Sequence, residues 1–283
     1  MGSRVILVEG PPGTGRTRLI QELTLQCAAQ AQVHQWWPAR RSGHPLRRPY
    51  DPAAYPTAEA YGSVLEVQWQ NFATRVATDD VVYLFDAALL QDAFRALLAT
   101  GSESGRIAAI CARLMDTLEP LAPRLLYLSR LDAPADAEQD WHHWRSCCDE
   151  TFAGLSQHRL LLNASRSDPQ QLLAEALDFI DLGHRPLLLE DDRLERLSGR
   201  YEAGGDEILI TRELAGAAIR LPAKLGVSGQ RPLLAGIDGS FLVAGCDLRI
   251  APREQSGYIE GLLLETGDPG LAALPNWLPR VGD

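Results

Sequence analysis

The sequence predicts an α/β fold: a three-layer domain built around a parallel sheet, followed by a small antiparallel β domain. Up to about residue 182, short apolar runs bounded by turn residues alternate with stretches whose apolar residues recur at helical spacing. The expected helices include one with Thr57 as its N-cap and one over residues 103–121. After about residue 198 the apolar period changes from 3.6 to 2, and glycine, proline and aspartate turns separate the runs. These observations divide the chain into domains of residues 1–183 and 184–283.

A glycine-rich turn joins the first predicted strand to the first predicted helix. Residues 4–9 are mostly apolar, residues 10–17 read Gly-Pro-Pro-Gly-Thr-Gly-Arg-Thr, and an amphipathic run follows. Glycines let the backbone approach an anion closely, so that successive N–H groups point inward and the next helix adds its positive end. The stretch fits the pattern G-x-x-x-x-G-K-[ST] at every fixed position except the lysine. It predicts a P-loop NTPase domain with nucleotide contacts from Gly10, Gly13, Thr14, Gly15, Arg16, Thr17 and Arg18.

Arg16 stands where the pattern has lysine. Arginine keeps the positive charge and can bind phosphate through two hydrogen bonds, but its planar fork is wider than an ammonium group. Among the 27 lysine and arginine residues of the chain, Lys224 is the only lysine. A general preference for arginine over lysine explains such an exchange on the surface better than in this loop, where the lysine has a specific geometric task. An engineered exchange of lysine for arginine at position 16 is the other explanation. The alternative for the whole stretch is a strand–helix turn without a ligand.

A second strand supplies the candidate metal ligand. The apolar run over residues 81–85 ends in Asp86, the form of the strand that gives a carboxylate to Mg2+ in P-loop proteins. Thr17 is the expected hydroxyl ligand of the same ion. Asp86 also suits the N-cap of a helix expected over residues 87–99. Gln91 is expected to face the same cleft.

Residues 123–129 are the third clearly predicted parallel strand. The segment that follows this strand, residues 130–155, resembles a lid. It carries Arg130 and Arg145, which we expect to act as mobile charges that close over a phosphoryl group. Together with Arg16 and Asp86 they form the predicted catalytic set. His143 and Cys147 are four residues apart, but without a second pair a metal site here is the weaker interpretation.

An arginine-rich loop follows the second predicted strand. Arg40, Arg41, Arg47 and Arg48 lie within nine residues of an otherwise acidic chain. We expect this loop to recognise an anionic small-molecule acceptor or nucleotide phosphates. The alternative is a solvated surface loop, which is what most charge runs are.

Composition narrows the class of protein. The net charge is −10 and the pI about 5.1, which disfavours binding of nucleic acid through a basic face. Five scattered cysteines fit free thiols in a reducing compartment. The sequence shows no signal-type leader and no apolar run of membrane-spanning length, so a cytoplasmic protein that does not bind membranes is expected. A homodimer is left open.

The first 182 or so residues resemble a P-loop kinase of the nucleoside and nucleotide kinase type, close to thymidylate kinase-like proteins. The resemblance rests on the Glu9-to-Thr17 stretch, the loop at His44-Pro45, the strand ending in Asp86, and the Leu-Tyr-Leu128 strand entering the lid. It implies ATP (or another NTP), Mg2+ and phosphoryl transfer to a small acceptor. The chain departs from the family at the loop lysine, in its arginine-poor lid over residues 130–155, and in lacking an Asp-Arg pair after the Asp86 strand.

The last hundred residues carry the predicted antiparallel strands. Their expected ranges are 206–212, 217–221, 240–243, 246–250 and 258–264, as in an antiparallel sheet or small barrel. The stretch Gly199-Arg-Tyr201 faintly resembles the small β domain appended to some serine-hydrolase-like proteins. No catalytic constellation is present, so we expect a module for interaction, dimerisation or covering of a pocket.

Three functions remain open at this point. The first is an ATP- and Mg2+-dependent small-molecule kinase, which the loop and the Asp86 strand favour. The second is a nucleotide-binding regulatory or scaffold protein without catalysis, which Arg16 and the arginine-poor lid favour. The third is an NTP hydrolase with water as acceptor, for which Gln91 is the candidate residue.

Overall fold

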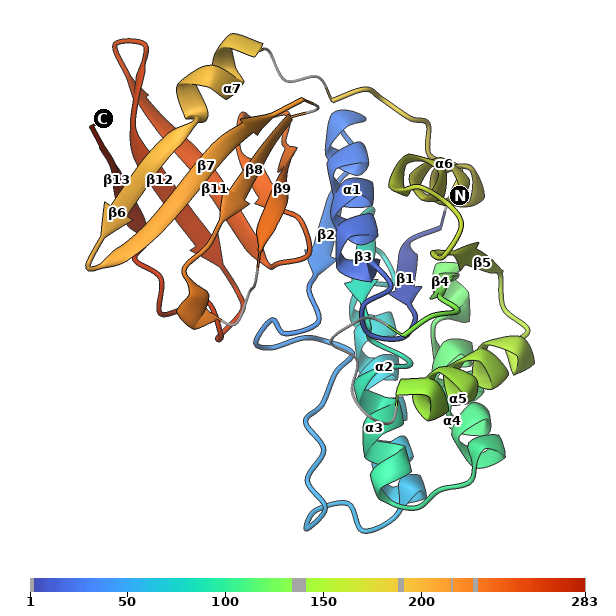
Figure 1. The fold of residues 1–283 in the computed structure, drawn as a ribbon. Coiled ribbons are helices and arrows are strands. Elements are labelled where there is room, and N and C mark those ends of the chain that lie inside the picture. Colours follow the sequence, from blue (N-terminus) through green and yellow to red (C-terminus); the bar gives the residue numbers. More distant parts are fainter. Residues whose placement is uncertain (1–2, 134–140, 188–190, 215, 226–228, 283) are drawn as a thin grey trace. The chain divides into compact units, whose positions relative to one another are not determined.

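The computed structural model describes residues 3–133, 141–187, 191–214, 216–225 and 229–282 (Figure 1). The chain divides into two compact units. One holds residues 43–184 and most of residues 1–39; the other holds residues 185–283 with the short segments 28–30 and 40–42. The first unit is α/β and the second is all β apart from short helices, so the predicted fold class is confirmed.

A five-stranded parallel sheet forms the centre of the first unit. Its strand order is β2-β3-β1-β4-β5, with bounds His34–Trp37, Val82–Asp86, Val5–Glu9, Arg124–Ser129 and Arg159–Asn163. Val8 pairs with Asp86, and Glu9 pairs with Tyr127. This register places the carboxyl ends of β1, β3 and β4 side by side, where open α/β sheets bind their ligands.

Helices cover both faces of this sheet, which gives the three predicted layers (Figure 1). Alternate residues of β1 point to opposite sides, as the period of a strand requires. Val5 and Leu7 pack with the helices α2, α3, α4 and α5, whereas Ile6 and Val8 pack with α1 and α6. The bounds are Arg16–Ala29 for α1, Ala58–Arg75 for α2, Asp92–Ala99 for α3, Ser104–Thr117 for α4, Trp141–Gly154 for α5 and Pro169–Phe179 for α6.

Two helix boundaries differ from the sequence prediction. The helix expected from residue 87 begins at Asp92, so the predicted N-cap role of Asp86 is wrong. The cause lies in the backbone: Ala87 has a left-handed φ of 57°, and the amides after it bond outside the helix. The helix expected over residues 103–121 ends at Thr117, and Glu119–Leu121 forms a short 3-10 turn (η1) that contains Pro120. The predicted cap Thr57 is confirmed, because its side chain accepts a hydrogen bond from Ala60 N.

The second unit is a closed antiparallel barrel preceded by the helix α7 (Asp191–Leu197). Its interior is filled by apolar side chains such as Tyr201, Phe241, Ile250 and Leu262. The strand order around the barrel is β10-β11-β12-β13-β6-β7-β8-β9. The bounds are Gly199–Ala203 (β6), Asp206–Glu213 (β7), Gly216–Arg220 (β8), Gln230–Ala235 (β9), Phe241–Val243 (β10), Leu248–Gln255 (β11), Tyr258–Thr266 (β12) and Trp277–Val281 (β13), with a short 3-10 turn (η2) at Ala223–Leu225.

Three of these strands were not expected as strands. They are β6, β9 and β13, and the last two contain Pro232 and Pro279. Proline within a run argues against a strand because it cannot donate to the ladder. Closure of the barrel overrides this local signal. Among the described residues, none of the helices is long and apolar enough to cross a membrane.

Candidate nucleotide-binding site

The loop between β1 and α1 has a backbone that only glycine adopts readily. Gly10, Gly13 and Gly15 have φ values of 140°, 79° and 90°. At Gly10 an added Cβ would lie 2.3 Å from the carbonyl oxygen of Leu128 on β4. The loop is therefore pressed against the end of the neighbouring strand. The backbone conformation favours glycine at all three positions, and at Gly10 the lack of space requires it as well.

Two side chains from the segment after β4 bind carbonyl groups of the loop. Trp141 Nε1 donates to Pro12 O at 3.1 Å, and Arg130 Nη1 donates to Gly13 O at 3.1 Å. In a trans peptide the C=O and the following N–H point in opposite directions. Binding these two carbonyls on one side therefore turns the N–H groups of Gly13 and Thr14 to the other side.

The amides of the loop make no internal hydrogen bonds. Within the residues that the structure describes, the N–H groups of residues 13–18 donate to no protein acceptor. They lie at the N-terminus of α1, a helix of 14 residues, whose dipole adds positive potential. Successive free amides at such a position form an anion-binding nest. The geometry fits the phosphate groups of a nucleotide.

Thr17 and Asp86, the predicted metal ligands, come together at this nest. Thr17 Oγ1 donates to Asp86 Oδ2 at 2.7 Å. Asp86 is 1% exposed, and its other carboxylate oxygen, Oδ1, has no partner among the described residues. Burial raises the pKa of Asp86, while the Arg16 charge and the Thr17 hydrogen bond lower it. A buried carboxylate oxygen beside a threonine hydroxyl is a donor set that suits Mg2+.

Arg16, which belongs to the same stretch, is buried, at 8% exposure. Its Nη2 donates to Gln91 Oε1 at 2.6 Å, and its Nη1 has no partner in the described part of the chain. Its charge lowers the pKa of both Glu9 and Asp86. A buried guanidinium with unused donor capacity beside free amides is the second feature here that favours an anion.

Glu9, at the end of β1, is a site residue for which the sequence analysis predicted no role. It is fully buried, and its carboxylate accepts hydrogen bonds from Leu89 N at 2.6 Å and Leu90 N at 3.0 Å. Burial raises its pKa to about 7, against the lowering effect of these bonds and of Arg16. Its position immediately before Gly10 was visible in the sequence, but its partners 80 residues away were not.

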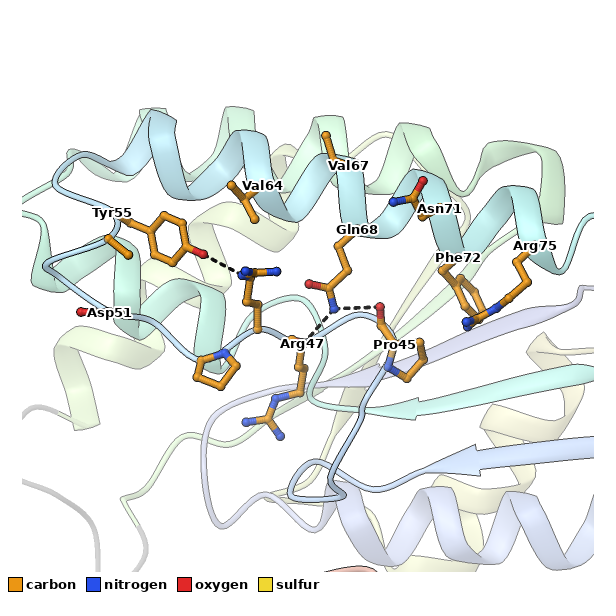
Figure 2. A pocket seen from close by; sticks show the side chains of 13 residues that line it. Pro45, Arg47, Asp51, Tyr55, Val64, Val67, Gln68, Asn71, Phe72 and Arg75 are labelled. Atoms are coloured by element: carbon orange, nitrogen blue, oxygen red, sulfur yellow. Dashed lines mark hydrogen bonds between the residues drawn. The ribbon is translucent and has the colours of Figure 1, made fainter.

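Of the four loop arginines, Arg47 is the one that reaches this site. Burial lowers its pKa, and the charges of Asp86 and Glu9 oppose that effect. Figure 2 shows its side chain directed away from α2. Arg48 instead bonds Tyr55 Oη at 2.7 Å through Nε. The segment 40–42, with the other two predicted arginines, belongs to the second compact unit.

A groove of about 880 Å3 is lined by this loop together with residues of α2 (Figure 2). Gln68 on α2 holds the loop in place, since its Nε2 donates to Pro45 O and Arg47 O at 2.9 Å each. Trp69 Nε1 adds a bond of 2.8 Å to Leu46 O. The backbone that carries Arg47 is therefore fixed to α2 at several points.

The remaining predicted residues are engaged elsewhere. Arg18 pairs with Glu22 along α1 at 3.1 Å, and Arg145 pairs with Asp149 along α5 at 3.2 Å. Cys147 Sγ lies 3.9 Å from His143 Nε2, but the described residues contain no group of three or more potential metal ligands. The structure thus brings Arg130 to the loop and leaves Arg18 and Arg145 in ion pairs.

No protein-family model and no curated protein matches the chain. Among solved structures it is similar to SurE with D-Leu (18% identity, TM-score 0.24, 40% of this chain and 26% of that chain). It is also similar to the signal recognition particle receptor FtsY from Elizabethkingia anophelis in complex with GDP (10%, 0.32, 63% and 54%). A third is XAC1771, a carbohydrate acetylesterase from Xanthomonas citri (12%, 0.27, 98% and 78%).

These likenesses are distant. The chain spans about a quarter of the length of SurE and about half of the length of FtsY, and each TM-score is below 0.5. None of them assigns an activity to this chain. The chain's own topology places a glycine loop between β1 and α1 and an aspartate at the end of β3.

Proposed function

We propose that the first unit binds an Mg2+–NTP complex, with ATP as the first candidate, and transfers its terminal phosphoryl group to a small acceptor. The observation that carries this proposal is the 2.7 Å contact of Thr17 Oγ1 with Asp86 Oδ2 beside the free amides of residues 13–18. Phosphoryl transfer needs mainly positioning and charge neutralisation, which these groups can provide. The resemblance to thymidylate kinase-like proteins points to the same reaction class.

Each residue has a distinct task in this proposal. The amides of residues 13–17 and Arg16 hold the phosphates, and Thr17 and Asp86 hold Mg2+. The bound nucleotide supplies the terminal phosphoryl group, whose bond to the bridging oxygen breaks as the bond to the acceptor oxygen forms. Arg130 neutralises charge on the leaving side. Arg47 meets the acceptor, which we expect to be anionic because this arginine lies among buried charges.

A second candidate function is nucleotide binding without catalysis. Two observations favour it. Arg16 has one guanidinium nitrogen committed to Gln91, and Arg145 is committed to Asp149 and to Leu131 O. Arginines held in this way are less available to follow the charge that develops in a transition state. The β barrel would then act in regulation or in assembly with a partner, which includes a second copy of the chain in a homodimer.

Calorimetric titration of MgATP and MgGTP tests the binding step. We expect saturable binding by the unaltered protein and weaker binding by Thr17→Val, which removes the hydroxyl at nearly constant volume. Thr24→Val is the matched control, because Thr24 lies on the same helix and its hydroxyl donates to Ile20 O of that helix at 2.7 Å. Absence of binding to either nucleotide would end the proposal.

Product analysis then separates the three functions. A kinase forms ADP only when an acceptor is present, and the acceptor gains the phosphoryl group. A hydrolase forms ADP and inorganic phosphate without an acceptor. A binding protein does neither, although the titration shows affinity.

A further inference from the structure

The end of β3 and the segment that follows it bond the residues on either side of the glycine loop at three points. Asp86 bonds Thr17, Glu9 bonds the amides of Leu89 and Leu90, and Gln91 bonds Arg16. The chain can turn back toward the loop because Ala87 adopts φ 57° and its N–H donates to Val8 O at 3.0 Å. The position of Gln91 is therefore fixed by backbone contacts on its N-terminal side.

Gln91 occupies the N-cap of α3, yet its side chain makes no capping bond. Ser, Thr, Asp or Asn at this position commonly accepts a hydrogen bond from an amide of the first turn, and glutamine is not one of these preferred caps. Here the oxygen accepts from Arg16 Nη2 at 2.6 Å. The side chain therefore holds the guanidinium and leaves the cap of its own helix unfilled.

Arginine needs such a partner at this loop position and lysine does not. An ammonium is a compact point charge with rotatable donors, whereas a guanidinium is a rigid planar fork whose two edges must both be satisfied when buried. An amide oxygen satisfies one edge without cancelling the charge, which a carboxylate would do. The other edge, with Nη1, has no partner among the residues described and remains for a phosphate.

We propose that Gln91 is a positioning residue that adapts the loop to arginine, so that Arg16 and Gln91 act together in place of the P-loop lysine. The inference rests on the proposed nucleotide-binding function. It also removes Gln91 as a residue that orients water for hydrolysis, because its oxygen is already engaged.

A double-mutant cycle on MgATP affinity tests the pairing. The four proteins are the unaltered chain, Gln91→Ala, Arg16→Lys and the double variant. Loss of a hydrogen bond to a charged group should weaken MgATP binding by about tenfold when Arg16 is present. In the Arg16→Lys background the same change should weaken it less than about twofold, because the ammonium does not use Gln91.

Gln91→Glu adds a readout that a purely structural role would not move. Glutamate has nearly the shape of glutamine, so packing alone predicts that Gln91→Glu lowers the MgATP affinity less than Gln91→Ala does. If Gln91 keeps the Arg16 charge available, the carboxylate cancels that charge and MgATP binding falls further than in Gln91→Ala. Gln171→Ala, on the exposed side of α6, is the control for loss of a glutamine and should leave the affinity unchanged.

The outcomes separate the inference from the function. Equal losses in the two backgrounds, or a milder effect of Gln91→Glu than of Gln91→Ala, would overturn the pairing while nucleotide binding stands. No MgATP binding by the unaltered protein would overturn the proposed function, and the pairing with it. Circular dichroism and thermal midpoints of all the variants identify any that fails to fold, and Gln91→Asn then replaces Gln91→Ala in the cycle.

Discussion

The buried carboxyl group of Glu9 makes the stability of the first unit depend on pH. Its pKa is raised from 4.5 to about 7 by burial, so the folded protein holds this proton more tightly than the unfolded chain. The stabilising contribution is complete below about pH 4.5 and disappears as the pH rises through about 7. A shift of this size corresponds to about 3 kcal/mol, most of it lost between about pH 5 and pH 8.

Glu9→Gln isolates this contribution. Glutamine keeps one oxygen for the amides of Leu89 and Leu90 but carries no titrating proton. The lost acceptor costs the same at every pH. We therefore expect the free energy of unfolding of the unaltered protein, minus that of Glu9→Gln, to fall by roughly 2–3 kcal/mol from pH 5 to pH 8.

Urea unfolding followed by tryptophan fluorescence measures the difference, since five of the six tryptophans lie in the first 184 residues. Glu175→Gln, on α6, is the control for loss of one carboxylate. A difference between the unaltered protein and Glu9→Gln that stays constant over this pH range would refute the reasoning.

Three further variants test the loop and its ligands. Gly10→Ala should destabilise the protein by more than about 2 kcal/mol in thermal unfolding, because its Cβ would meet Leu128 O at 2.3 Å and its φ is 140°. Trp141→Phe removes the donor to Pro12 O and should weaken MgATP binding roughly fivefold, the equivalent of about 1 kcal/mol, in a calorimetric titration. Asp86→Asn should raise the Kd of MgATP about tenfold or more while changing the Kd of metal-free ATP much less.

Each of these has a contradicting outcome. Gly105→Ala, on α4 with no neighbour within 4 Å of the added Cβ, should be tolerated, and an equal loss in both glycine variants would show that the crowding at Gly10 is not the cause. Unchanged MgATP affinity of Trp141→Phe would show that the Pro12 carbonyl does not orient the loop. Equal losses for ATP with and without Mg2+ in Asp86→Asn would remove the metal role.

The sequence was sufficient to predict those features of the fold that depend on the local pattern of apolar and turn residues. Alternating strand and helix periods predicted the three layers, and the change of period near residue 198 predicted an antiparallel β domain. The loop motif predicted Thr17, and the apolar strand that ends in an acidic residue predicted Asp86, as ligands of one ion; the structure brings their side chains to 2.7 Å. Parallel strands explain this, since their carboxyl ends meet at one edge of the sheet.

What the sequence could not supply depends on contacts between distant residues. The bonds of Glu9 to the amides of Leu89 and Leu90 follow from strand register and from the left-handed Ala87, which no local propensity favours. Trp141 binds a carbonyl 129 residues earlier in the chain. The helix α3 begins at Asp92 and not at residue 87 as predicted, because the amides of Leu89 and Leu90 donate to Glu9 and the chain is not helical there.

The central claim is that the free amides of residues 13–18 receive a polyphosphate. Hydrogen–deuterium exchange measures those amides directly, without and with saturating MgATP. The account predicts slower exchange in peptides covering residues 10–18 when MgATP is present, and unchanged exchange in barrel peptides such as those from β11 and β12. Exchange in residues 10–18 that MgATP leaves unaltered, while titration shows the nucleotide bound, would contradict the account.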